Sequence, residues 1–278
     1  MLVEILKFVL FSILIVLISK YVLVKLLRKL GESLNLSAKT VGNVTGLATS
    51  VPELLTVTFS AFAGLSATTI YNIISSNVIN LVQYILSIIL NKNQKQFSNK
   101  GIKIQLILVL FTILIPILIL IFNIELEINF VPIFILLFIF FNYINSNIHK
   151  LYLKKQDENI YKEIEEEKKW LRGKVKLITK YLIYLVFTTI ALYLIGDALS
   201  IVLENMAQIF NISEFLIGVI LGFITSIPEL ITFFESQKHY KKGKVQEGVI
   251  EATNNLLTSN VLNLFIIQTI GIVIVNLV

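Results

Sequence analysis

Residues 49–56 read TSVPELLT, and nearly the same stretch returns at 225–232 as TSIPELIT. Both copies lie inside long apolar sequence, so each places a carboxylate, Glu53 or Glu229, at a depth where only hydrocarbon is expected. An ionisable group inside a membrane is costly unless it has a partner, and it usually marks a functional site. Two such acids in a duplicated motif predict an ion site.

The composition indicates that the surroundings are a membrane. Hydrophobic residues make up 56% of the 278-residue chain, and charged residues only 15%. A soluble domain has about 25% charged residues, and a helix of about 20 apolar residues crosses the hydrocarbon of a bilayer. We therefore expect an all-α, polytopic membrane protein with about eight transmembrane helices. The expected spans are 3–25, 39–62, 67–90, 102–122, 129–148, 177–195, 213–235 and 248–276.

Basic residues predict the orientation. If residues at helix ends are assigned to the nearest loop, every Lys and Arg except Lys7 falls on one side of the membrane. Because such loops stay in the cytoplasm, the N-terminus is expected outside, the charged central loop inside, and the protein in the cell membrane. The net charge of +6 then follows from topology. The expected partners are membrane lipid and transported cations rather than nucleic acid.

Metal and cofactor chemistry is limited by the residue types. The chain has no Cys, and its two His residues, His149 and His239, fall in predicted loops. This argues against thiolate or imidazole ligation, and no cofactor is expected. An intramembrane hydrolase is disfavoured as well, since no Ser/His or Asp/Asp constellation lies at membrane depth.

The chain divides into two halves. A first half at 1–149 with five spans is followed by a charged cytoplasmic linker at 150–174 and a second half at 175–278 with three spans. The halves repeat each other at about 34–83 and 210–266. Three features fall in register: Gly42 and Gly46 on Gly218 and Gly222, the TSxPEL motif on itself, and SSNVIN at 75–80 on TSNVLN at 258–263 after an insertion near Lys241 and Lys244. The motif helices run in opposite directions, which predicts inverted-topology repeats with a midplane binding site.

The repeated residues fit a cation cage. Pro52 and Pro228 each remove a backbone N–H, which frees a carbonyl oxygen in a setting where water cannot pair with it. Hydroxyl groups flank both carboxylates, and a polar stripe follows on the next helix of each half. The candidate oxygens are those of Thr49, Ser50, Thr225, Ser226, Asn72, Ser76, Asn80, Asn255, Ser259 and Asn263. Oxygen ligands without sulfur or imidazole suit Ca²⁺, Na⁺ or similar ions.

These motifs resemble the alpha repeats of the cation/Ca²⁺ exchanger superfamily, the sodium/calcium exchangers and their relatives. In that family the two Glu coordinate Ca²⁺, and neighbouring Thr, Ser and carbonyl oxygens form Na⁺ sites. Carried onto matching positions, the resemblance implies a metal site of Glu53, Glu229, Thr49, Ser50, Thr225, Ser226, Ser76, Asn80, Ser259 and Asn263.

The chain departs from the family pattern in three ways. Ala48, Ile224, Ser75 and Thr258 stand where family members commonly have Gly. Asn263 stands where many Na⁺-coupled members have Asp, which leaves the counter-ion open among Na⁺, H⁺ and K⁺. The second half lacks a counterpart to the helix pair at 102–148, so the chain is expected to be a shortened exchanger, a fragment, or a protein whose gap a partner fills. Because Asn254 and Asn260 would then face lipid, a homo-oligomer that covers them is expected.

These observations favour a secondary active antiporter rather than an enzyme. It would exchange Ca²⁺ for Na⁺ or H⁺ by alternating access at the two-Glu site. Two alternatives stay open: a cation channel that uses the same Glu pair, and a degenerate exchanger-like scaffold that transports nothing. The direction of Ca²⁺ flux is not predicted. Glu235, Glu247 and Glu251 are expected at the cytoplasmic interface, with Glu251 as a possible entrance residue.

Overall fold

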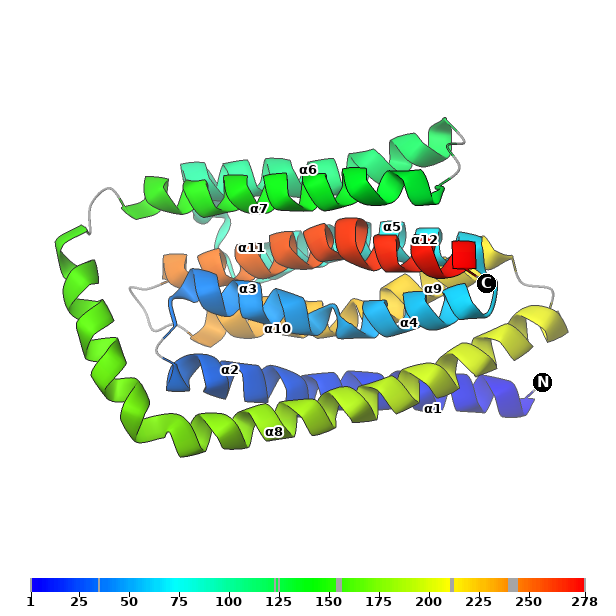
Figure 1. Cartoon of the computed structure of the whole chain (residues 1–278), viewed down its shortest axis with the longest axis horizontal. Coiled ribbons are helices and arrows are strands. Elements are labelled where there is room, and N and C mark those ends of the chain that lie inside the picture. Colours follow the sequence, from blue (N-terminus) through cyan, green and yellow to red (C-terminus); the bar gives the residue numbers. More distant parts are fainter. Residues whose placement is uncertain are drawn as a thin grey trace.

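The computed structural model describes residues 2–34, 36–122, 124, 126–153, 157–210, 213–239 and 245–277. Within these ranges every regular element is helical. Most helices run side by side along the long axis of the molecule, as Figure 1 shows. This agrees with the all-α membrane architecture expected from the sequence.

The first half begins with a continuous helix that contains one π-helical turn. Its elements are α1 (Leu2–Ile18), η1 (Ser19–Leu23), α2 (Val24–Ser33), α3 (Ala38–Thr49), α4 (Val51–Phe62), α5 (Ser66–Leu90), η2 (Gln94–Ser98), α6 (Lys100–Ile121), η3 (Ile128–Phe130) and α7 (Val131–Leu153). The third expected span is α5, and the fourth and fifth correspond to α6 and α7. The second expected span is divided into α3 and α4.

The second half starts with one long helix. Its elements are α8 (Asp157–Phe210), α9 (Glu214–Thr225), α10 (Ile227–His239), α11 (Val245–Leu262), η4 (Asn263–Ile267) and α12 (Gln268–Leu277). Helix α8 includes most of the expected linker and continues through the sixth span without a break. The side chains of residues 149–176 and the insertion around Lys241 and Lys244 lie outside the described residues.

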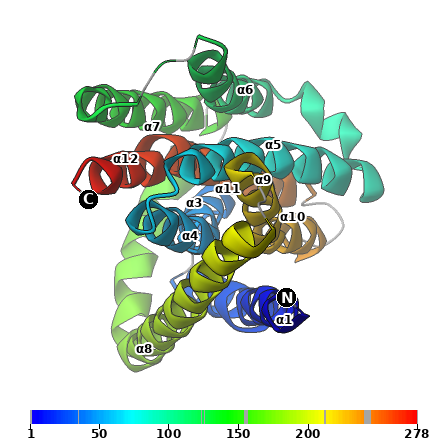
Figure 2. The same cartoon turned by 90° about the vertical axis from the view of Figure 1, so that its right-hand side faces the viewer.

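The helices form three layers, which Figures 1 and 2 show from two sides. The middle layer holds the motif helices α3, α4, α5, α9, α10 and α11 together with α12. Helix α8 packs on α1, α2 and α4 along one face of this layer. Helices α6 and α7 cover the opposite face, where they contact α11, η4 and α12. The repeated motifs therefore lie at the centre, away from lipid.

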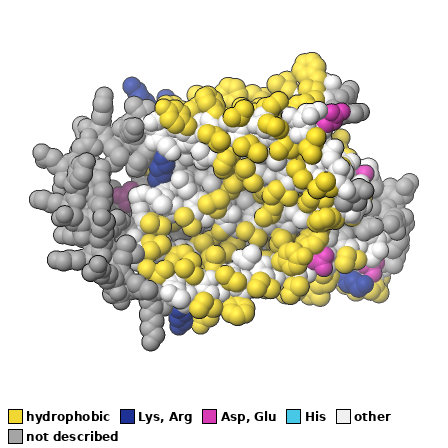
Figure 3. Space-filling view, viewed as in Figure 1, with side chains coloured by type: hydrophobic (Ala, Val, Ile, Leu, Met, Phe, Trp, Pro, Cys, Tyr) yellow, Lys and Arg dark blue, Asp and Glu magenta, His cyan; other side chains and the backbone are white. Residues whose placement is uncertain are grey.

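The outer surface fits a bilayer. Six helical segments of the described chain are long and apolar enough to cross a membrane: 66–90, 100–121, 128–148, 177–202, 214–239 and 245–277. The α1–α2 and α3–α4 segments run alongside them, which is consistent with about eight spans. In Figure 3 a broad hydrophobic band separates one end where most visible Lys and Arg lie from the other, where most Asp and Glu lie. The protein is thus an integral membrane protein.

The expectation that a second subunit must shield Asn254 and Asn260 is wrong in its premise. Both side chains are fully buried, and the chain's own α6 covers them. Gln105 of α6 donates its amide to Asn254 Oδ1 and to Asn145 Oδ1 of α7, each at 2.9 Å. The pair α6 and α7, counted with the first half in sequence, packs over the second half in space. The pair therefore covers the side of the second half that carries Asn254 and Asn260, for which the sequence predicted no covering helices.

Candidate functional site

Both TSxPE motifs interrupt a helix at the centre of the molecule. The break falls at Ser50 (φ −81°, ψ 0°) between α3 and α4, and at Ser226 (φ −79°, ψ −2°) between α9 and α10. The expected spans 39–62 and 213–235 place Pro52 and Pro228 inside helices, but each is the second residue of a new helix. Proline is well tolerated there because a first-turn N–H has no helical partner anyway.

The break places each carboxylate at the start of a helix. Glu53 lies in the first turn of α4, and Glu229 lies in the first turn of α10. Backbone N–H groups at a helix start carry partial positive charge, which favours an anion there. The carbonyl of Ala48, four residues before Pro52, receives no helical hydrogen bond from that proline. The N–H of Ser50 contacts the Ala48 carbonyl instead, and that of Ser226 contacts the equivalent Ile224 carbonyl. Each break therefore places a carboxylate at a helix start, as in the discontinuous helices of transporters.

Equivalent serines begin the two motif helices. Ser37 accepts a hydrogen bond from the N–H of Thr40 at the start of α3, and Ser213 accepts one from Leu216 at the start of α9. Such N-caps satisfy backbone donors that the helix itself leaves unpaired. The same local signal thus fixes where both interrupted helices begin.

Glycines let each motif helix approach the opposite half. A Cβ atom at Gly46 of α3 would lie 2.7 Å from the carbonyl oxygen of Asn255 in α11. A Cβ atom at Gly222 of α9 would lie 2.9 Å from the carbonyl oxygen of Asn72 in α5. Gly42 and Gly218 lie equally close to the same partner helices. The site is consequently built across the halves, and neither half assembles it alone.

The same close packing explains two of the departures from the family pattern. Ser75 and Thr258 face Gly222 and Gly46 across these contacts. The hydroxyl of Ser75 donates to the carbonyl of Gly218 at 3.2 Å, and that of Thr258 donates to Asn43 Oδ1 at 3.1 Å. Because the facing helix has glycine at these contacts, it leaves room for the larger side chains. The hydroxyl groups of Ser75 and Thr258 find hydrogen-bond acceptors on that facing helix.

The two carboxylates are fully buried and lie near each other. Glu53 and Glu229 are both 0% exposed, and they interact electrostatically. Ser259 of α11 donates to Glu229 Oε1 at 3.0 Å. Ser259 in turn accepts from Ser50, at the break between α3 and α4, at 2.9 Å and from Asn80 of α5 at 3.4 Å. One serine therefore joins α5, α11 and the break between α3 and α4 to the carboxylate of α10.

Threonine and asparagine side chains repeat the same contacts in both halves. Asn72 of α5 donates to Thr56 of α4 at 2.8 Å, and Asn255 of α11 donates to Thr232 of α10. Across the halves, Ser76 pairs with Thr225 at 3.5 Å. Thr49 lies at the same distance from Asn255 Oδ1. The Asn–Thr contact is thus repeated in both halves, whereas the two cross-half threonine contacts use non-equivalent partners, Ser76 and Asn255.

Buried oxygens without hydrogen-bond partners gather at this site. Both carboxylate oxygens of Glu53 and one of Glu229 have none, and neither do Ser226 Oγ, Asn80 Oδ1 and Asn263 Oδ1. A buried acceptor left unpaired costs about 1–3 kcal/mol. These six oxygens belong to residues predicted for the site, and they have the hard-ligand chemistry that Ca²⁺ and Na⁺ select. The donor set therefore fits a dehydrated cation.

All ten residues predicted for the metal site are buried, each at most 2% exposed. Eight of them lie within the network around the two carboxylates: Glu53, Glu229, Thr49, Ser50, Thr225, Ser76, Asn80 and Ser259. Ser226 and Asn263 add unpaired oxygens. Asn263 is also tied to the first half, because its amide donates to Asn77 Oδ1 at 3.2 Å. Whether the ten bind metal stays a prediction.

Sequence reasoning missed Asn77 and underrated Asn260. Each donates its side-chain amide to the other's backbone carbonyl, which joins α5 and α11. A usable signal was present, since both repeats place Asn directly after the stripe serine, in SSN and TSN. Thr56 and Thr232 were also overlooked, although the motif itself repeats them.

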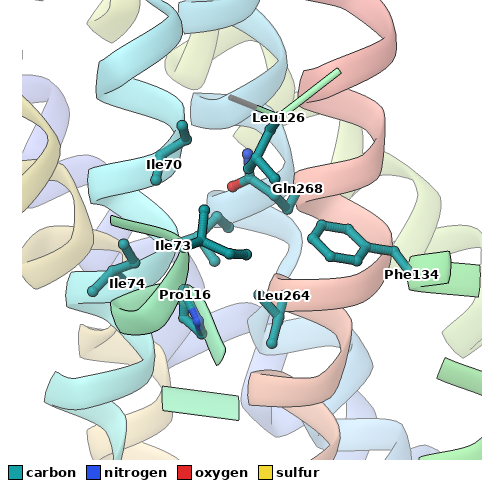
Figure 4. A pocket seen from close by; sticks show the side chains of 9 residues that line it. Ile70, Ile73, Ile74, Pro116, Leu126, Phe134, Leu264 and Gln268 are labelled. Atoms are coloured by element: carbon teal, nitrogen blue, oxygen red, sulfur yellow. The ribbon is translucent and has the colours of Figure 1, made fainter. Parts of the chain in front are cut away.

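Other cavities and clusters do not compete with this site. Among the described residues, no group of three or more His, Asp or Glu side chains is placed to hold a metal. A small pocket between α5, α6, α7 and α12 is lined by hydrocarbon from Ile70, Ile73 and Phe134, as Figure 4 shows. Gln268 contributes an amide to this lining. A wall of this kind offers too few oxygens to replace the hydration shell of a cation.

Comparison with known families agrees with the geometry. A family model described as "Sodium/calcium exchanger protein" matches residues 4–148 and 180–277, which is most of the chain. This chain belongs to the sodium/calcium exchanger protein family. The resemblance inferred from the two TSxPE motifs is thereby confirmed. No curated protein matches the chain.

A solved structure shares the fold of this exchanger-family protein. The structure is of the sodium-calcium exchanger NCX_Mj soaked with 10 mM Na⁺ and zero Ca²⁺. The two chains are 20% identical with a TM-score of 0.57, and the match covers 99% of this chain and 84% of that one. At this identity the likeness establishes the fold of the exchanger-family chain.

Proposed function

We propose that this protein is a secondary active antiporter that exchanges Ca²⁺ for Na⁺ or H⁺ at the Glu53/Glu229 site. The observation that carries the proposal is the set of unpaired buried oxygens on these two carboxylates and on other residues predicted for the site. Family membership supports cation exchange in general. The site chemistry supports Ca²⁺, because two carboxylates balance its double charge and neutral oxygens complete the shell.

The buried acid pair also supplies a basis for coupling. Two carboxylates without a counter-charge are expensive to keep inside a protein. Once Ca²⁺ leaves, two or more monovalent cations or protons must replace it before the site changes its access. Both acids are fully buried, so an occluded site of this kind separates the two sides of the membrane. Because the site changes its access only when its two negative charges are neutralised, release of Ca²⁺ on one side is coupled to binding of the replacing cations.

The proposed orientation follows from the charged ends of the molecule. Exposed Lys92 and Lys95 lie in the turn after α5, and exposed Lys238 lies at the end of α10. These positions share the Lys-rich end, which we assign to the cytoplasm of a cell-membrane protein. The opposite end, with the N-terminus of α1, is assigned to the outside.

Reconstitution into liposomes tests the proposal. Uptake of ⁴⁵Ca²⁺ is measured under an imposed Na⁺ gradient, then under a pH gradient, then under a K⁺ gradient. Uptake that requires one of the three gradients identifies the coupling ion. Uptake driven by membrane potential alone, together with single-channel conductance, would instead indicate a cation channel. A folded chain that neither binds nor transports Ca²⁺ would indicate a scaffold.

A further inference from the structure

A third carboxylate, Glu251, is buried in the protein but takes no part in the site described above. It lies in the second turn of α11 and is 1% exposed. Ser236 of α10 donates to Glu251 Oε1 at 2.6 Å. The side chain of this acid is therefore enclosed by protein. A buried acid in a membrane protein is costly, and its position calls for a reason.

Glu251 ends a row of polar contacts that begins at the ion site. On α10 the row contains Glu229, Thr232 and Ser236, and on α11 it contains Ser259, Asn255 and Glu251. These six residues, which we call the polar ladder, are paired as Glu229–Ser259, Thr232–Asn255 and Ser236–Glu251. Each is at most 1% exposed. The ladder is thus a buried, oxygen-lined track with a carboxylate at each end.

The length and direction of the ladder suit an access path. Eight residues separate Glu251 from Ser259, which corresponds to about 12 Å along an α-helix. Glu251 lies toward the beginning of α11 at Val245, and Ser236 lies toward the end of α10. The far rung is therefore nearer than Glu229 to the Lys-rich end of the molecule. A cation that enters from that end would meet the carboxylate of Glu251 before that of Glu229.

The first half shows that the fold does not require this acid. The equivalent residues there are Ser60 and Thr68, and the middle rung, Thr56–Asn72, is kept at 2.8 Å. The backbone packing is also kept: Cβ atoms at Gly42 and Gly218 would meet the carbonyls of Glu251 and Thr68 respectively. Threonine therefore serves equally well for helix packing at this position. In the first half a half-buried carboxylate reaches this position from α9, because Glu214 accepts from the N–H of Thr68 at 2.9 Å. A fully buried carboxylate between the two helices of the same half is found at Glu251 of the second half.

We propose that Glu251, with Ser236 and Asn255, forms a separate cation site on the path between the Lys-rich end and Glu229. A single carboxylate balances one positive charge, and the oxygens of Ser236 on the same rung and of Asn255 on the next rung are neutral. Ca²⁺ takes six to eight oxygens and is usually held by more than one carboxylate. The site is accordingly assigned to a monovalent cation, with Na⁺ as the probe. This inference extends the proposed exchange function but can be tested without transport.

Thermal unfolding of the full chain in mild detergent tests the assignment. A ligand that binds the folded protein raises its midpoint temperature. The shift caused by Na⁺ is measured against equal concentrations of N-methylglucamine. We expect a Na⁺ shift in the wild type and a smaller but definite one in the double variant E53Q/E229Q. Adding E251Q to that background is expected to abolish the remaining shift.

Three variants serve as controls. E247Q removes a half-buried acid one turn earlier on α11 and is expected to keep the full Na⁺ shift. S236A and S60A remove hydroxyls at equivalent positions of the two halves, and only S236A is expected to reduce the shift. If E251Q does not fold, the comparison of S236A with S60A tests the site instead, since only S236A should reduce the Na⁺ shift. A Na⁺ shift that disappears in E53Q/E229Q, or that survives both E251Q and S236A, overturns the proposal.

The outcome separates this site from the proposed exchange. If wild-type liposomes show no Ca²⁺ exchange but the Na⁺ shift depends on Glu251, the ladder site stands and the exchange function fails. If exchange is present but the Na⁺ shift does not depend on Glu251, the exchange function stands and the ladder site fails.

Discussion

Asn77 and Asn260 each donate a side-chain amide to the other's backbone carbonyl, at 3.2 Å and 3.1 Å. The two residues are equivalent in the repeats, so the contact lies across the pseudo-twofold axis of the molecule. Thr112 of α6 extends the contact, because its carbonyl accepts from Asn77 and its hydroxyl accepts from Asn260. The pair thus fixes the two polar stripes against each other and ties them to α6.

Replacing either residue of this pair is expected to destabilise the protein. N77A and N260A each remove amide donors from a fully buried place and leave acceptors without partners. We expect each substitution to lower the free energy of unfolding by about 1–3 kcal/mol, with similar values for the two variants. Thermal unfolding in detergent measures the change. N142A serves as the control, because Asn142 is exposed and bonds only within its own helix. A loss no larger than that of N142A would contradict the assigned role.

The cross-half glycines give a second prediction. G46A and G222A add Cβ atoms within 3.0 Å of backbone atoms on the facing helix, so the helices must move apart. Overpacking of this kind costs about 1–3 kcal/mol, and it also separates oxygens of the ion site. Unfolding temperature and Ca²⁺ binding should both fall. In G196A the nearest side-chain atom would lie at 3.2 Å, and this change should be tolerated. If G46A, G222A and G196A had the same unfolding temperature and the same Ca²⁺ binding, the close helix contacts at Gly46 and Gly222 would be contradicted.

Asn263 tests the charge of the site. N263D removes the amide that donates to Asn77 Oδ1 and adds a third negative charge beside two acids. The protein should be less stable without cations, and the added charge should be compensated by binding one more monovalent cation. The concentration of Na⁺ or H⁺ needed for half-maximal Ca²⁺ exchange should therefore change in N263D relative to the wild type. The same dependence in both proteins would assign Asn263 to packing alone.

Topology can be read with single cysteines, because the chain contains none of its own. Lys95 of η2 and Asn129 of η3 are exposed and lie at opposite ends of α6. In intact cells, a membrane-impermeant maleimide should label N129C at once and K95C only after permeabilisation. The reverse pattern would invert the proposed orientation and move the entrance at Glu251 to the outside.

Much of this architecture was predictable because the sequence carries it locally. The repeated TSxPE motif and the polar stripe indicated the exchanger family and the polar residues that the protein buries. Ser37 and Ser213 were aligned by the repeat, and both begin motif helices. The family resemblance, the helical membrane fold and the burial of the ten site residues agree with those expectations.

The remaining features depend on tertiary contacts that a linear pattern does not encode. Hydropathy places Asn254 inside the membrane, but it does not say whether lipid, another subunit or Gln105 lies against it. Periodicity places Glu251 on the same helical stripe as Ser259. The position near the end of a span suggested an interfacial residue, whereas packing between α10 and α11 buries it. In both cases a residue on a different helix determines the surroundings of the side chain.

Ca²⁺ uptake by proteoliposomes that contain wild type, E53Q or E229Q tests the central claim most directly. Each substitution removes one negative charge at nearly constant shape, and E235Q, at a half-buried acid near the end of α10, is the control. The account predicts gradient-driven uptake in wild type and E235Q, and background uptake in E53Q and E229Q, with all four proteins folded by thermal unfolding. Wild-type uptake in either E53Q or E229Q would contradict the assignment of the two-Glu site.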